Sequence, residues 1–92
     1  MRQGWINSIG GERRHYVNDL LHREDGPACI VKNGNGEVIY NAYYINDKWH
    51  REDGFAREWF NFDGSVTGMY YICDEYLDSN KFLIYKLNKL LT

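Results

Sequence analysis

Apolar and polar residues alternate along most of the chain in short runs, which are separated by residues typical of turns. The runs are rich in β-branched and aromatic side chains and too short for ordinary helices, so they predict strands. The predicted strands are 28–32, 37–45, 56–62 and 66–72. Within 37–45, alternation places Val38, Tyr40, Ala42 and Tyr44 on one face and Ile39, Asn41, Tyr43 and Ile45 on the other. Neither face is wholly polar, so we expect the second face to be covered or used for binding.

Turn residues between these runs predict how the strands connect. Asn-Gly and Asp-Gly pairs are strong hairpin signals, and Asn-Asp pairs mark further reversals. The pairs are Asn18-Asp19, Asp25-Gly26, Asn35-Gly36, Asn46-Asp47, Asp53-Gly54 and Asp63-Gly64. The sequence therefore predicts a mainly β fold, an antiparallel β-meander of hairpins.

The hydrophobic spacing changes near residue 79. Leu83, Leu87, Leu90 and Leu91 fall at helical spacing, and Asp78 or Ser79 can cap the start of the segment. Lys86 and Lys89 lie where they suit the negative end of a helix dipole. We expect an amphipathic helix over 79–91 that covers the sheet and caps the last hairpin.

The chain also repeats itself. His15-Tyr16-Val17-Asn18-Asp19 recurs as Tyr43-Tyr44-Ile45-Asn46-Asp47 after 28 residues, and as Tyr70-Tyr71-Ile72-Cys73-Asp74 after a further 27. The 28-residue shift also aligns His22-Arg23-Glu24-Asp25-Gly26 with His50-Arg51-Glu52-Asp53-Gly54. We predict a single repeat domain over 1–92. Its parts are a partial unit at 1–14, units at 15–42 and 43–69, a partial unit at 70–78 and the capping helix at 79–91.

Composition limits the classes of function. The 92 residues are 43% hydrophobic and 16% aromatic, which favours one small folded domain. A net charge of −2 lacks the basic footprint of a nucleic-acid binder and favours a protein partner. Cys29 and Cys73 have no paired spacing, so we expect free thiols. With no signal-peptide-like or membrane-spanning apolar run in the sequence, we expect a cytoplasmic protein.

The repeated His-Arg-Glu-Asp-Gly string has a chemical and a structural interpretation. His22 and His50 with their acidic neighbours could serve as bases or metal ligands, but a catalytic set has little reason to recur every 28 residues, and His-x-Glu supplies too few ligands. A structural interpretation uses every position, with Asp-Gly making a turn in which glycine adopts positive φ and aspartate accepts backbone N–H groups. We expect structural roles for His22, Asp25, Gly26, His50, Asp53 and Gly54. No catalytic residue, metal ligand or cofactor is predicted, and the chain is interpreted as non-enzymatic.

The string carries a family resemblance. With the preceding tyrosine and Asn-Asp pair, it resembles the MORN-like "HREDGPA" repeats of small proteins from bacteriophages, prophages and large DNA viruses. The resemblance covers residues from about Glu12 to Leu77 and is strongest in 15–28 and 43–56. Phe55 replaces the motif proline, and the string is missing after Tyr76. The resemblance implies hairpin meanders that bind proteins or, in some members, lipids. It also implies a viral accessory protein that antagonises host factors in the host cytoplasm, as anti-CRISPR and other anti-defence inhibitors do.

The surplus of large aromatic residues is the remaining functional signal. Eight Tyr and three Trp exceed what a small core needs, and interfaces concentrate binding energy in Tyr, Trp and Arg. We expect Trp5, Tyr43, Arg57 and Tyr70 to contact a host protein. Alternatives are a single-stranded nucleic-acid binder or mimic, since aromatic residues stack on bases, and a His/carboxylate metal-binding protein. A membrane is the least favoured partner, because the apolar face of the predicted helix is short and needed by the sheet.

Overall fold

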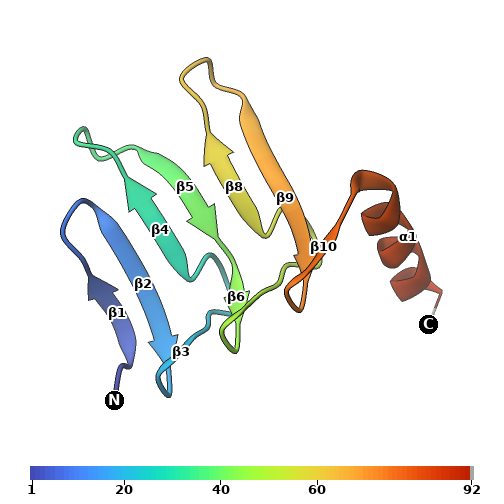
Figure 1. Ribbon diagram of the computed structural model, residues 1–92, viewed down its shortest axis with the longest axis horizontal. Coiled ribbons are helices and arrows are strands. Elements are labelled where there is room, and N and C mark those ends of the chain that lie inside the picture. Colours follow the sequence, from blue (N-terminus) through green and yellow to red (C-terminus); the bar gives the residue numbers. More distant parts are fainter. Residues whose placement is uncertain (92) are drawn as a thin grey trace.

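The protein is an antiparallel β-sheet protein with one C-terminal helix (Figure 1). The computed structural model describes residues 1–91. The elements are β1 (Gly4–Asn7), β2 (Glu12–Val17), β3 (Leu20–Leu21), β4 (Cys29–Lys32), β5 (Val38–Ala42), β6 (Tyr44–Ile45), β7 (Lys48–Trp49), β8 (Arg57–Phe60), β9 (Val66–Ile72), β10 (Glu75–Leu77) and α1 (Ser79–Leu90). The mainly β class and the helix position predicted from sequence are confirmed.

The long strands lie side by side in chain order across Figure 1. Among the described residues, eight strands share one sheet of order β1-β2-β4-β5-β8-β9-β10, with β3 paired to β2. β6 and β7 form a two-stranded sheet of their own. All pairings are antiparallel, so connections between neighbours are short.

Each of the four predicted strands matches observed strands, but one of them is divided in two. The run 37–45 is divided into β5 and β6 at Tyr43. The Tyr43 N–H still donates to the Ala56 carbonyl at 2.7 Å and continues the β5–β8 alignment, whereas the next residue, Tyr44, pairs with Trp49. The alternation that predicted one strand cannot detect this change of partner.

The sheet is a single layer. The Cα extents of 42 × 38 × 18 Å leave room in the shortest direction for one sheet with side chains on both faces. The buried apolar residues are small or aromatic: Tyr16, Ala28, Cys29, Ala42, Ala56, Tyr71 and Phe82. Ala28, Ala42 and Ala56 are fully inaccessible, and each takes part in backbone hydrogen bonds: Ala28 N–H donates to the Ala42 carbonyl, and Tyr43 N–H donates to the Ala56 carbonyl. A larger side chain at these positions would obstruct the close approach of the chain.

The register defines two faces of the sheet. Residues directly across an antiparallel pair share a face. The Arg57 face carries the row Arg14, Cys29, Ala42, Arg57 and Met69, and the Glu58 face carries the adjacent row Arg13, Ile30, Asn41, Glu58 and Gly68.

Helix α1 lies beyond β10 at one end of the sheet and does not cover a face (Figure 1). Asp78, one of the two N-cap candidates predicted from sequence, is the N-cap, and its carboxylate accepts the Lys81 N–H at 2.9 Å. The expectation that the leucines of the helix cover the sheet is wrong. Phe82 is the buried residue of the helix, whereas the leucines are exposed. In the part of the chain that the structure describes, no helix has the length and apolar character needed to span a membrane.

Candidate functional site

Three tight turns recur at equivalent places, between β2 and β3, β6 and β7, and β9 and β10. In each, both central residues have positive φ, near 50° and then near 70°: Asn18 and Asp19, Asn46 and Asp47, Cys73 and Asp74. Two consecutive positive values are what a type I′ hairpin turn requires, and Asn and Asp tolerate them well. Cys73 occupies the position that asparagine holds in the other two turns.

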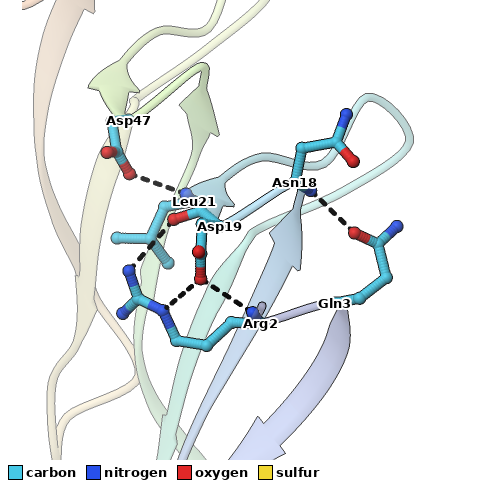
Figure 2. A network of polar contacts seen from close by, with 6 residues as sticks. All are labelled: Arg2, Gln3, Asn18, Asp19, Leu21 and Asp47. Atoms are coloured by element: carbon cyan, nitrogen blue, oxygen red, sulfur yellow. Dashed lines mark hydrogen bonds and ion pairs between the residues drawn. The ribbon is translucent and has the colours of Figure 1, made fainter.

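Each turn is hydrogen-bonded to a segment that precedes it in the chain. The Asp47 carboxylate accepts the Leu21 N–H at 2.6 Å, and the Asp74 carboxylate accepts the Trp49 N–H at 2.7 Å. Asp19 accepts the Arg2 N–H at 2.7 Å, and Figure 2 shows this contact beside the Asp47–Leu21 bond. The backbone N–H of each aspartate donates in return to the carbonyl of the same partner. Every aspartate thus closes a reciprocal pair of bonds.

A second bond holds the first residue of each turn. The N–H of Asn46 donates to His22 Nδ1 at 3.0 Å, and that of Cys73 donates to His50 Nδ1 at 3.1 Å. In the first turn the Asn18 N–H donates instead to Gln3 Oε1 at 2.7 Å (Figure 2). Both histidines of the repeated string therefore act as hydrogen-bond acceptors for the next turn.

The arginine of each string folds back on its own loop. Arg23 Nε donates to Asp25 at 3.0 Å and Arg23 Nη1 to the Pro27 carbonyl at 3.1 Å. Arg51 repeats this with Asp53 at 3.1 Å and the Phe55 carbonyl at 3.1 Å. The two aspartates thus contact a guanidinium, whereas the sequence interpretation gave them backbone N–H groups.

The reason for glycine after each of these aspartates also differs from the expectation. Gly26 and Gly54 do not have positive φ. A Cβ at either position would lie about 3.0 Å from the guanidinium of Arg23 or Arg51. Glycine therefore leaves the space that the arginine fills, and a larger residue would require the guanidinium to move.

A hollow of about 760 Å³ lies between the two loops. It is lined by Arg23, Asp25, Tyr43, His50, Arg51 and Asp53, among others. The guanidiniums inside it are already bound to loop carboxylates and carbonyls. Within the described residues, no group of three or more His, Cys, Asp or Glu side chains is placed to hold a metal ion.

Trp5, Tyr43 and Tyr70, three of the predicted contact residues, lie on the Glu58 face and are half-buried. The Trp5 ring is 5.1 Å from His15, and the guanidiniums of Arg13 and Arg23 lie over it at 4.5 and 5.0 Å. The Trp5 ring is therefore in contact with one aromatic and two cationic neighbours.

Tyr43 belongs to a polar network around Glu58. The Arg51 guanidinium lies 3.9 Å from the Tyr43 ring centroid and 3.5 Å from the Glu58 carboxylate. Glu58 also accepts from Asn41 at 3.2 Å and from the Tyr43 hydroxyl at 3.5 Å. Burial raises the pKa of Tyr43, so the phenol remains a neutral donor at physiological pH.

Tyr70 stands in a column of rings that reaches the helix. Its centroid is 4.6 Å from Phe55 and 4.0 Å from Phe82, which in turn stacks on Tyr85 at 6.5 Å. Phe55, which stands where the first string has Pro27, therefore begins the aromatic contact between the sheet and α1.

Arg57 lies on the opposite face, at the centre of a group that we name the Arg57 cluster: Tyr40, Trp49, Arg57 and Trp59. Its Nε donates to the Tyr40 hydroxyl at 3.0 Å, and its guanidinium is 4.4 and 5.0 Å from the ring centroids of Trp49 and Trp59. All four residues are half-buried. The four predicted contact residues are thus divided, with Arg57 separated from the other three by the sheet.

Several contributors were missed by sequence reasoning. Arg2 and Gln3 bind the first turn, although sequence reasoning gave neither residue a role within the predicted partial unit at 1–14. Tyr40, Trp49 and Trp59 were not named as contact residues, although alternation with Arg57 places Trp59 on its face. Trp49 precedes the repeated string, and only the folded chain shows that its ring lies against Arg57.

Both cysteines are free thiols, with Cys29 buried and Cys73 exposed. Burial raises the pKa of the Cys29 thiol. The Cys73 sulfur lies 3.5 Å from His50 Nδ1, the atom that also accepts the Cys73 N–H.

Comparison with protein-family models, with curated proteins and with solved structures finds no match to this chain.

Proposed function

We propose that this chain is a non-enzymatic protein-binding module, built from MORN-like hairpin units of about 28 residues. It acts as a phage-type accessory protein that occupies a surface of a host protein complex in the host cytoplasm, as an inhibitor or adaptor. Support for the repeated unit comes from the turn contacts, because Leu21–Asp47 recurs as Trp49–Asp74.

The Arg57 cluster is the observation that carries the proposal. It joins two Trp, one Tyr and one Arg on a face that the helix does not cover. These residue types dominate the energetics of protein interfaces, where they form hot spots surrounded by weaker contacts. The guanidinium is held between rings and by the Tyr40 hydroxyl, so little side-chain entropy remains to be lost on binding.

The proposal is tested by affinity enrichment from a bacterial lysate. Wild type is compared with Arg57→Ala/Trp59→Ala, with Trp5→Ala/Tyr70→Ala on the Glu58 face, and with Ile30→Ala as a matched strand control. Circular dichroism establishes that each variant is folded. We expect one host complex to be enriched by wild type and Ile30→Ala and lost in Arg57→Ala/Trp59→Ala.

The same experiment separates the alternatives. Loss of the complex only in Trp5→Ala/Tyr70→Ala would place the interface on the Glu58 face instead. Salt-sensitive retention of nucleic acid without a protein partner would contradict the proposal and favour a single-strand binder, whose affinity depends on phosphate contacts.

A further inference from the structure

The outer surface of helix α1 is an aliphatic stripe without a partner within the described chain. We name it the leucine stripe: Leu83, Ile84, Leu87, Leu90 and Leu91. These side chains are between 50% and 84% exposed, although isolated surface helices normally turn such a stripe toward a core. An exposed apolar patch of this kind marks an interaction site.

The helix is attached through its other side. Phe82, Tyr85 and Lys89 follow one another at helical spacing, and all three face the sheet. Phe82 stacks on Tyr70 at 4.0 Å, while the Tyr85 hydroxyl and Lys89 Nζ approach Glu52 at 2.7 and 3.3 Å. At about 100° per residue the leucine stripe is centred on the opposite side, so docking of α1 leaves it pointing outward.

The charges of the helix have one sign. Of the 11 basic residues, Lys81, Lys86 and Lys89 lie in α1, which contains none of the 13 acidic residues. The helix therefore carries +3 and the remainder of the chain 8 − 13 = −5. Lys81 and Lys86 fall on the two flanks of the leucine stripe, where their long stems can keep the charge at its rim.

This charge pattern selects among the possible occupants. A second copy of the helix would bring three more lysines against the first three, with no acidic residue in either helix to compensate. A surface of lipid headgroups with negative charge, over an apolar interior, complements both the stripe and its rim. Because α1 lies at one end of the sheet, it can meet such a surface while the acidic remainder stands away from it (Figure 1).

We propose that α1 is a membrane-surface anchor that lies flat on anionic phospholipid, with the leucine stripe in the acyl boundary and Lys81 and Lys86 at the headgroups. The anchor lies outside the repeated hairpins and acts independently of the Arg57 cluster. The sequence argument against a membrane partner was that the apolar face of the helix is needed by the sheet. That argument does not hold, because the leucine stripe is exposed.

The test is co-sedimentation of the full chain with vesicles of equal parts phosphatidylcholine and phosphatidylglycerol, against pure phosphatidylcholine vesicles. Leu87→Gln/Leu90→Gln removes apolar surface without changing charge or helix propensity. Ile9→Gln/Phe62→Gln is the matched control, since both side chains are fully exposed at hairpin tips. Lys81→Gln/Lys86→Gln tests the charge, and Lys89 is left intact because it pairs with Glu52.

We expect wild type and the Ile9→Gln/Phe62→Gln control to bind the anionic vesicles and not the neutral ones. Partitioning should fall by roughly tenfold or more in Leu87→Gln/Leu90→Gln, and clearly in Lys81→Gln/Lys86→Gln. Absence of wild-type binding, or an equal loss in the hairpin-tip control, would refute the anchor. A wild-type dimer in sedimentation velocity that Leu87→Gln/Leu90→Gln converts to monomer would refute it as well, because a second copy would then cover the stripe.

Discussion

The N–H of the first residue of each tight turn is accepted by glutamine in one turn and by histidine in the other two. Gln3 Oε1, His22 Nδ1 and His50 Nδ1 each accept the N–H that opens a turn. An amide oxygen accepts this N–H in the first turn and an imidazole nitrogen in the other two, so the contact requires a hydrogen-bond acceptor.

This equivalence gives the first prediction. His22→Asn keeps an acceptor near the position of Nδ1 and should change the free energy of unfolding little, whereas His22→Leu should cost about 1–2 kcal/mol because the Asn46 N–H loses its partner. Urea denaturation of the two variants measures the difference. Zinc titration of wild type is the companion measurement, and submicromolar binding lost in His22→Asn would contradict a purely structural histidine.

Two glycines provide the second prediction. A Cβ at Gly68 would lie 2.1 Å from the ring of Phe55, whereas Gly34 has no heavy atom within 4 Å of its Cβ position and no positive φ. Gly68→Ala should therefore destabilise the protein by about 1–3 kcal/mol, while Gly34→Ala should be neutral or slightly stabilising. Thermal unfolding of both variants is the measurement, and equal melting temperatures would show that Phe55 moves aside without cost.

Sequence predicted which residues have structural roles better than it predicted the contacts that explain those roles. The repeat identified His22, Asp25 and Gly26 as a unit, but the assignment of glycine to positive φ was wrong, since Gly26 accommodates the guanidinium of Arg23. Turn propensity is a local property that sequence carries. The return of a long side chain onto its own loop depends on contacts that sequence alone does not encode.

At the scale of elements, the helix shows the same division. Its start follows from local chemistry, and the predicted range 79–91, with Asp78 or Ser79 as the cap, differs from the observed Ser79–Leu90 by one residue at the C-terminal end. Which side of the helix docks is decided by Phe82 and Tyr85, whose partners Tyr70 and Glu52 lie in earlier units. A hydrophobic stripe indicates that apolar surface is available and does not indicate what it contacts.

The attachment of α1 leads to a prediction about pH. Hydrogen bonding from Tyr85, and then from Lys89, lowers the pKa of Glu52 below its ordinary value. The charged form is thus favoured in the folded state, so its stabilising effect is present above the unfolded pKa and is lost as the pH falls through the lowered one. The side chain is about half exposed, so the effect should stay below about 1 kcal/mol.

Glu52→Gln is the matched variant for this prediction. At neutral pH wild type should melt at a higher temperature than Glu52→Gln, and the difference should shrink as the pH falls through the lowered pKa of Glu52, because the carboxylate then becomes protonated. Tyr85→Phe should behave in the same way, since it removes the hydroxyl donor. A difference that persists unchanged at acid pH would mean that the ion pair contributes nothing.

For the whole molecule, the single layer implies uneven stability. The three inaccessible alanines lie in the middle of the sheet, while β1 and α1 are at its ends. We predict that native-state hydrogen exchange is slowest at the amides of Ala28, Tyr43 and Ala56, and fastest in β1 and α1, because end elements can open without disturbing the centre. Equal protection in all elements would show that the sheet unfolds only as one unit.

Sequence was sufficient for the class of the fold and insufficient for the layout of the candidate site. Strand alternation and turn pairs are periodic local signals, so 66–72 was predicted with the bounds of β9. The candidate contact residues were chosen one at a time, and only the register shows that Arg57 faces away from Trp5 and Tyr43. Assignment to one face requires knowing which strands pair, which is a property of the assembled sheet.

Because each turn is hydrogen-bonded to an earlier segment, the chain can begin to fold while it is being synthesised. Leu21 precedes Asp47 by 26 residues, and Trp49 precedes Asp74 by 25. Among the side-chain contacts of the described residues, the hydrogen bond from Tyr85 to Glu52 spans 33 residues, and the Lys89–Glu52 ion pair spans 89 − 52 = 37. As the chain leaves a ribosome, each turn therefore meets partners that have already emerged, and no strand waits for a distant C-terminal segment. Such a chain can fold progressively from its N-terminus, with little apolar strand surface exposed at any moment.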